Sequence, residues 1–111
     1  MRSVGRGLAF RGSSLDDLRA FPTSARREAG YQLDKVQSGL DPSDWKRMNA
    51  IGQGVREIRI RDKAGAFRVI YVARFQSAMF VLHYFQKKTQ ATPQADLELA
   101  KSRYRDLLKE L

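Results

Sequence analysis

The sequence predicts an α+β fold of N-terminal helices, an antiparallel β-meander and a C-terminal helix. Apolar residues recur every three or four positions over residues 25–40, as they do on one face of a helix. Over residues 55–61 they instead alternate, as on a half-buried strand. With 111 residues, we expect a single domain that spans residues 1–111.

Two helices are predicted in the first half. Ser13 and Ser14 precede the acids of a short first helix, which Phe21-Pro22 ends. Thr23 or Ser24 is predicted to cap a longer helix that ends at Gly39. The buried stripe predicted for the longer helix consists of Ala25, Ala29, Leu33, Val36 and Leu40.

Strands are predicted at residues 55–61, 67–75 and 79–85, joined by short turns at residues 62–65 and near residues 76–77. Short connections imply antiparallel pairing. The middle segment is apolar on both faces, which indicates a central strand. Leu8-Ala9-Phe10 is a candidate for an additional strand beside them.

The C-terminal segment has the pattern of an amphipathic helix. Thr92-Pro93 is predicted to open it, with Thr92 as the cap and Pro93 at the first position. Its predicted buried stripe consists of Leu97, Ala100, Tyr104, Leu107 and Leu111.

The composition excludes several classes of protein. There is no cysteine and only one histidine, so neither a disulfide framework nor a zinc site built on Cys or several His is expected, and we expect no metal and no cofactor. No apolar run is long enough to span a membrane, and the basic first residues lack the apolar stretch of a signal peptide, so we expect a cytoplasmic protein. The net charge of +9 indicates a polyanionic partner.

Cationic residues occur along the predicted strands and are expected to meet at one end of the sheet. RNA cleavage through the 2′-hydroxyl needs a proton acceptor, a proton donor and cations that stabilise the phosphorane. Arginine suits the last task, and a lysine crowded by other cations suits proton transfer. Tyr71 and Tyr84 are candidates for stacking on a base. The cationic candidates are Arg59, Arg61, Arg68, Arg74, Lys87 and Lys88.

Each candidate also has a structural interpretation. Arg59 and Arg61 fit a solvated strand face, and Lys87-Lys88 fit a solvated loop. Arg68 enters an apolar strand, where it either serves the site or forms an ion pair with Glu57. His83 is either a core histidine held by one hydrogen bond or a catalytic group.

Three segments together resemble the phage-derived, HigB-like branch of the RelE/ParE toxin superfamily. These are Val55–Arg61, Gly65–Tyr71 and Val81–Gln90, followed by Thr92-Pro93 and the last helix. The resemblance implies a RelE-like fold, metal-independent mRNA cleavage on the ribosome, and a cognate helix-turn-helix antitoxin that links the pair to DNA. It assigns Arg59 and Arg61 to RNA binding, and Arg68, Lys87, Lys88 and His83 to catalysis. The sequence departs from the RelE pattern at two places. It has Glu57 where RelE members carry a basic residue, and it has no tyrosine near Thr92-Pro93.

The sequence therefore predicts the toxin of a type II toxin–antitoxin system, a ribosome-dependent mRNA endoribonuclease that inhibits translation. Its partners would be the antitoxin, the ribosome and mRNA, with no membrane contact. Two alternatives stay open at this point. One is a ParE-like toxin that binds DNA gyrase without catalysis, and the other is an inactive prophage-derived protein that binds nucleic acid.

Overall fold

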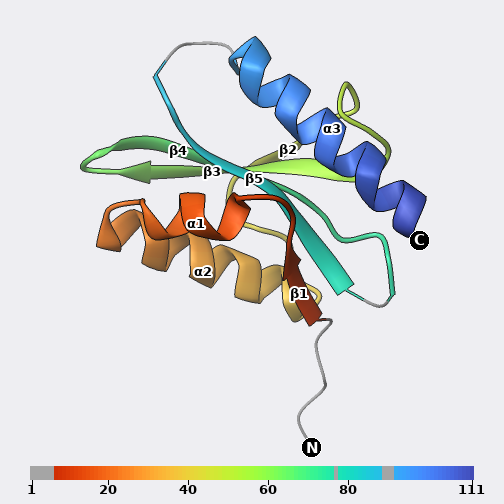
Figure 1. The fold of residues 1–111 in the computed structure, drawn as a ribbon. Helices are drawn as coiled ribbons and strands as arrows, with labels where there is room; N and C mark the ends of the chain where they lie inside the picture. The colour runs from red at the N-terminus through yellow and green to blue at the C-terminus, as the bar shows by residue number, and fades with distance from the viewer. Residues whose placement is uncertain (1–6, 77, 89–91) are drawn as a thin grey trace, which may run out of the picture.

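The computed structural model describes residues 7–76, 78–88 and 92–111, and its centre is a five-stranded sheet (Figure 1). The strands lie in the order β1-β5-β4-β3-β2, and every pairing is antiparallel except that of β1 with β5. The elements are β1 (Gly7–Phe10), α1 (Ser14–Arg19), α2 (Thr23–Gln37), β2 (Trp45–Arg47), β3 (Val55–Asp62), β4 (Gly65–Val72), β5 (Ala78–Lys87) and α3 (Gln94–Glu110).

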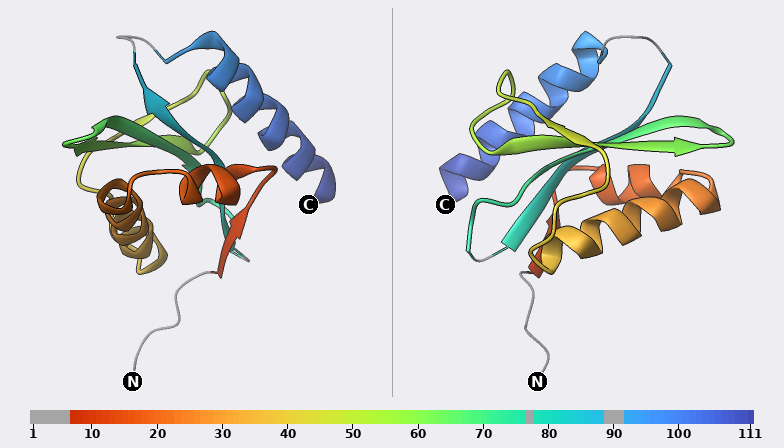
Figure 2. Two further views of the ribbon diagram at one scale, coloured as in Figure 1. Left: turned by 60° about the vertical axis from the view of Figure 1, so that its left-hand side comes forward. Right: turned by 180° about the vertical axis from the view of Figure 1, so that it is seen from behind.

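Helices cover both faces of the sheet. Figures 1 and 2 show α1 and α2 together on one face and α3 on the other. The predicted α+β order and the central position of β4 are confirmed, as is the additional strand at residues 8–10. The strand β2 was not predicted, because its three residues are too few to show an alternating pattern.

The core on the α2 face is built by small residues of the helix and large residues of the sheet. Ala25 and Ala29 are completely buried, which lets α2 lie close to β3. Leu40 was predicted to extend this stripe, but α2 ends at Gln37 and Leu40 is 59% exposed.

The core on the α3 face joins Ala100, Tyr104 and Leu107 to β3, β4 and β5. Leu111 was predicted to belong to this stripe, but it lies beyond the end of α3 and is 60% exposed. The Tyr104 hydroxyl donates a 2.7 Å hydrogen bond to the carbonyl of Gln53, so α3 is also fixed to the loop before β3.

None of the predicted hydroxyl caps is made. Ser13 stands at the N-cap of α1, but its hydroxyl donates to Asp17 Oδ2 at 3.0 Å, and Pro22 occupies the N-cap of α2. At the start of α3, Pro93 is the N-cap, and the Thr92 hydroxyl donates instead to Glu57 Oε2 at 3.2 Å. The hydroxyl of Thr92 therefore joins the start of α3 to the sheet.

Among the described residues, none of the helices combines the length and the hydropathy that crossing a bilayer requires.

Gly52 and Gly30 provide a matched test of the packing of α3. A Cβ on Gly52 would lie 2.1 Å from Cε2 of Tyr104, a buried ring that cannot move aside, whereas a Cβ on Gly30 meets nothing within 4 Å. We expect Gly52→Ala to lower the free energy of unfolding by about 2 kcal/mol. Gly30→Ala should raise it by about 0.5–1 kcal/mol, because alanine favours the helix. Urea denaturation measures both, and equal values would contradict the packing of Tyr104 on Gly52.

Candidate functional site

The α3-facing side of the sheet carries a cluster of cations beyond the apolar core. Side chains alternate between the two faces of a strand, so Glu57, Arg59 and Arg61 share the face on which Val55 packs beneath α3. Register pairs Arg59 with Arg68 of β4, and Ala66 with Lys87 of β5. Lys46 of β2 pairs with Glu57 and therefore lies on the same face. Cations from the four strands β2 to β5 thus share one face of the sheet.

We call Lys46, Arg59, Arg61, Arg68 and Lys87 the cationic face. A hollow of about 370 Å³ opens on it, lined by the three arginines together with Asp44, Asp62, Gly65 and Ala66.

Glu57 is the buried counter-charge of the cationic face. Its side chain is completely buried, and its Oε1 lies 3.6 Å from Nε of Arg68 and 3.9 Å from Nε of Arg59. Two arginines opposite each other on neighbouring strands would repel. The carboxylate between them offsets that repulsion and fixes both guanidinium groups.

Arg68 is held more firmly than the other cations. It is 9% exposed, and its guanidinium also donates to the carbonyl of Phe67 at 3.1 Å. Burial, followed by the charges of Arg59 and Arg61, lowers the pKa of Arg68, while Glu57 acts in the opposite direction. Both expectations for Arg68 are therefore compatible: it forms the ion pair with Glu57 and it lines the hollow.

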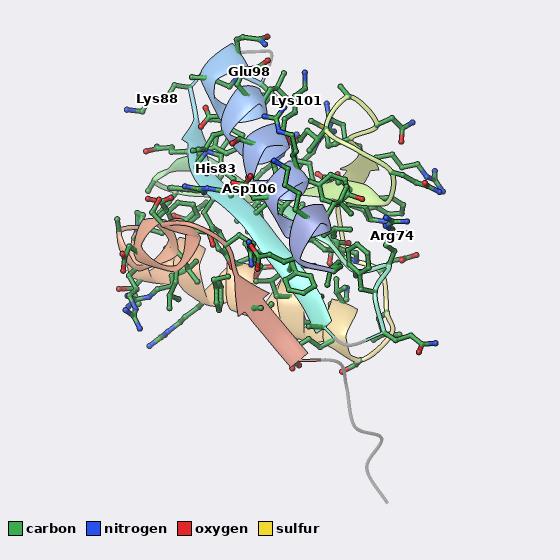
Figure 3. The ribbon with its side chains drawn as sticks, turned by 45° about the vertical axis from the view of Figure 1, so that its right-hand side comes forward. Arg74, His83, Lys88, Glu98, Lys101 and Asp106 are labelled. Atoms are coloured by element: carbon green, nitrogen blue, oxygen red, sulfur yellow. The ribbon has the colours of Figure 1, made fainter. Side chains whose placement is uncertain are left out.

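Lys87 and Lys88 stand at the end of β5. Partial burial and the charge of Arg68 lower the pKa of Lys87, and Lys46 and Arg59 add to the effect. The crowding by cations that the sequence predicted for a lysine is therefore present at Lys87. Lys88 is exposed just beyond the strand and points away from the body of the protein (Figure 3).

His83 lies on the same face of β5 but is 5% exposed. Its Nε2 lies 2.6 Å from Oδ1 of Asp96 in the first turn of α3, and NH1 of Arg103 lies 3.4 Å from its Nδ1. Its ring also stacks on Phe85, with centroids 5.2 Å apart. With both ring nitrogens engaged by α3, His83 is placed to hold the helix, as the structural interpretation of this histidine expected.

Three of the RNA-binding candidates lie elsewhere. Tyr71 and Tyr84 are 0% and 1% exposed in the core on the α2 face, so neither ring is available to stack on a base. Their positions on β4 and β5 point them to the face opposite the cationic one. Arg74 follows the far end of β4 and lies apart from Lys88 (Figure 3), so it is not part of the cationic face.

The sequence does not indicate a role for Lys46, and it indicates Glu57 only as a partner of Arg68. Lys46 lies on the unpredicted strand β2, so nothing in the sequence placed it near Lys87. The alternation of residues 55–61 places Glu57 on the polar face with Arg59 and Arg61, and only the packing of Thr92 over that face shows that its carboxylate is buried.

The chemistry available on the cationic face is electrostatic and acid–base. Guanidinium groups bind phosphate oxygens in pairs, and a lysine of lowered pKa exchanges protons nearer to neutral pH. Among the described residues, no group of three or more histidine or acidic side chains is arranged to hold a metal ion.

Comparisons with known proteins identify the family. The model of the family described as "Phage derived protein Gp49-like (DUF891)" matches residues 16–105. A double arginine-to-alanine variant of the E. coli toxin RelE, solved in the free state, is similar in structure, with a TM-score of 0.62 at 12% identity over 93% of this chain and 98% of that chain. No curated protein matches the chain in sequence. The chain therefore belongs to the phage-derived Gp49-like family, and the similarity in structure confirms the predicted RelE-like fold.

Proposed function

We propose that this protein is a toxin that inhibits translation by cutting mRNA on the ribosome without a metal ion. The observation that carries the proposal is the cationic face, with three arginines around one hollow and a buried carboxylate that fixes two of them. Membership of the Gp49-like family and the RelE-type fold support the toxin class. A toxin that acts by binding DNA gyrase, without catalysis, would not need a cluster of cations that binds a phosphate.

In the proposed reaction, the 2′-hydroxyl attacks the neighbouring phosphorus and the bond to the 5′-oxygen breaks. Arg68 is the residue best placed to stabilise the phosphorane, because Glu57 and the carbonyl of Phe67 fix its guanidinium before substrate binds. Arg59 and Arg61, which line the same hollow, would bind the flanking phosphates.

Proton transfer falls to the two lysines at the end of β5. Lys87, with its lowered pKa, is the candidate that accepts the 2′-hydroxyl proton, and Lys88 is the candidate that protonates the leaving oxygen. We propose no proton transfer through His83, because the ring is buried and engaged by Asp96 and Arg103.

The partners in this proposal are the ribosome, mRNA and a cognate helix-turn-helix antitoxin, which would provide the only link to DNA. The function is tested by brief induction of the protein in bacterial cells, followed by mapping of mRNA 5′ ends. We expect new 5′ ends inside translated regions, and no new 5′ ends when ribosomes are removed from the mRNA. Rapid degradation of naked RNA by the purified protein would contradict the proposed dependence on the ribosome. Inhibition of translation without new mRNA 5′ ends would contradict the proposed nuclease activity.

We expect Arg68→Ala to slow the cleavage step about 100-fold or more, because it removes a fixed donor that stabilises the transition state. Single-turnover cleavage on programmed ribosomes measures this rate, with Arg105→Ala, an exposed position on α3, as the matched control. A thermal melt separates catalysis from folding, since Arg68→Ala also leaves Glu57 with one fewer partner. A folded variant that cleaves at the normal rate would remove Arg68 from the site.

Lys87→Arg tests the proton acceptor. The substitution keeps the positive charge but removes the group whose pKa lies below the usual 10.5. For a base, the rate should rise with pH as Lys87 loses its proton, and this rise should vanish in Lys87→Arg. We expect the cleavage rate to fall about 100-fold while ribosome affinity stays within about twofold. Lys63→Arg, in the exposed β3–β4 turn, is the control, and an unchanged pH–rate profile in Lys87→Arg would assign the base elsewhere.

A further inference from the structure

A second hollow lies at the other end of the β3–β4 hairpin, between the C-terminal end of α2 and the loop before β3. Its volume is about 420 Å³, and its lining includes Val36, Leu40, Asp41, Arg47, Arg56 and Arg74. We call it the arginine hollow. None of the residues of the cationic face lines it.

Aromatic rings hold all three guanidinium groups of the arginine hollow. Arg56 lies over the ring of Trp45 at 4.0 Å, and Arg47 lies over the same ring at 5.6 Å. Arg74 lies over the ring of Phe75 at 4.7 Å. A guanidinium held on a ring loses less side-chain entropy when it binds an anion, and its N–H edge stays available.

The arginine hollow carries an excess of positive charge. Asp41 is the acidic residue in its lining, and it pairs with Arg56 at 3.1 Å. In the part of the chain that the structure describes, neither Arg47 nor Arg74 has a carboxylate within ion-pair distance, and both are exposed. Two fixed cations are thus left to bind an incoming anion.

The rest of the lining combines the polar side chains of Asn49 and Gln53 with the apolar residues Val36, Leu40 and Val55. Val36 is almost completely buried in the core on the α2 face, and Leu40, which is 59% exposed, is the lining residue that offers apolar surface to a ligand. Apolar surface beside fixed cations suits a ligand that brings an aliphatic side chain and carboxylates together. RNA fits less well, because bases bind by stacking on aromatic rings and the rings here already carry guanidinium groups.

We propose that the arginine hollow binds an acidic segment of a partner protein, which inserts an aliphatic side chain while its carboxylates pair with Arg47 and Arg74. The proposal stands on the hollow alone and does not depend on the nuclease function. It accounts for cations that lie far from the cationic face and that a single phosphate site would not use.

The test is an NMR titration of the full protein, labelled with ¹⁵N, with a short end-capped peptide of alternating Glu and Leu. We expect the largest shifts at the amides of Gly39, Leu40, Gly54 and Ala73, which line the hollow. Arg47→Gln with Arg74→Gln should weaken binding about tenfold. Arg56 is left in place, because Asp41 already pairs with it.

The matched control is Arg26→Gln with Arg27→Gln, which removes the same charge from exposed positions of α2. We expect this pair to change the affinity by less than about twofold. An equal loss in both double variants would show attraction to net charge alone and overturn the proposal. So would unchanged binding of a Gln–Leu peptide, shifts confined to the cationic face, or an oligouridine RNA that occupies the hollow when the Glu–Leu peptide does not.

Discussion

The buried carboxylate of Glu57 is the constraint on which the cationic face depends. Register forces Arg59 and Arg68 to face each other across β3 and β4, and a pair of like charges at that spacing opposes sheet formation. Because Glu57 lies two residues before Arg59 on the same face, its Oε1 reaches both guanidinium groups. Two cations and the Thr92 hydroxyl offset the free-energy cost of burying the Glu57 carboxylate, and the result is a positive surface with fixed geometry.

The start of α3 also contacts Glu57 and the edge of the cationic face. Thr92 bonds to Glu57, and Asp96 contacts His83, so the first turn of the helix is joined to β3 and β5 at the edge of the cationic face. At the other end, Tyr104 and Leu107 pack into the apolar core of the same face. Docking of α3 and the geometry of the arginines are therefore coupled: an event that lifts the helix also removes one partner of the buried carboxylate.

The sequence predicted what depends on local pattern. Periodicity gave α2, the β3–β4 hairpin and the central place of β4, since a strand buried on both faces has a continuous apolar run. It did not give β2, whose three residues hold one side of the cationic face, and it misplaced Tyr71 and Tyr84. Those errors share a cause: which face of a strand looks toward which helix depends on pairing across the sheet, and neither aromatic character nor charge reveals it. Family resemblance supplied the candidate roles, but only the register brought Lys87 close to Arg68.

The net charge of +9 is the sum of groups in different surroundings, and the surroundings decide what each group binds. On the cationic face, arginines lie over a buried carboxylate and beside a lysine of lowered pKa, with polar residues lining the hollow. In the arginine hollow, guanidinium groups lie on aromatic rings beside valine and leucine. The first setting fixes arginines and a lysine around a site for a phosphate, whereas the second combines fixed cations with apolar surface that gains from losing water. Net charge alone would treat the cationic face and the arginine hollow as one surface for nucleic acid, although the two lie at opposite ends of the β3–β4 hairpin.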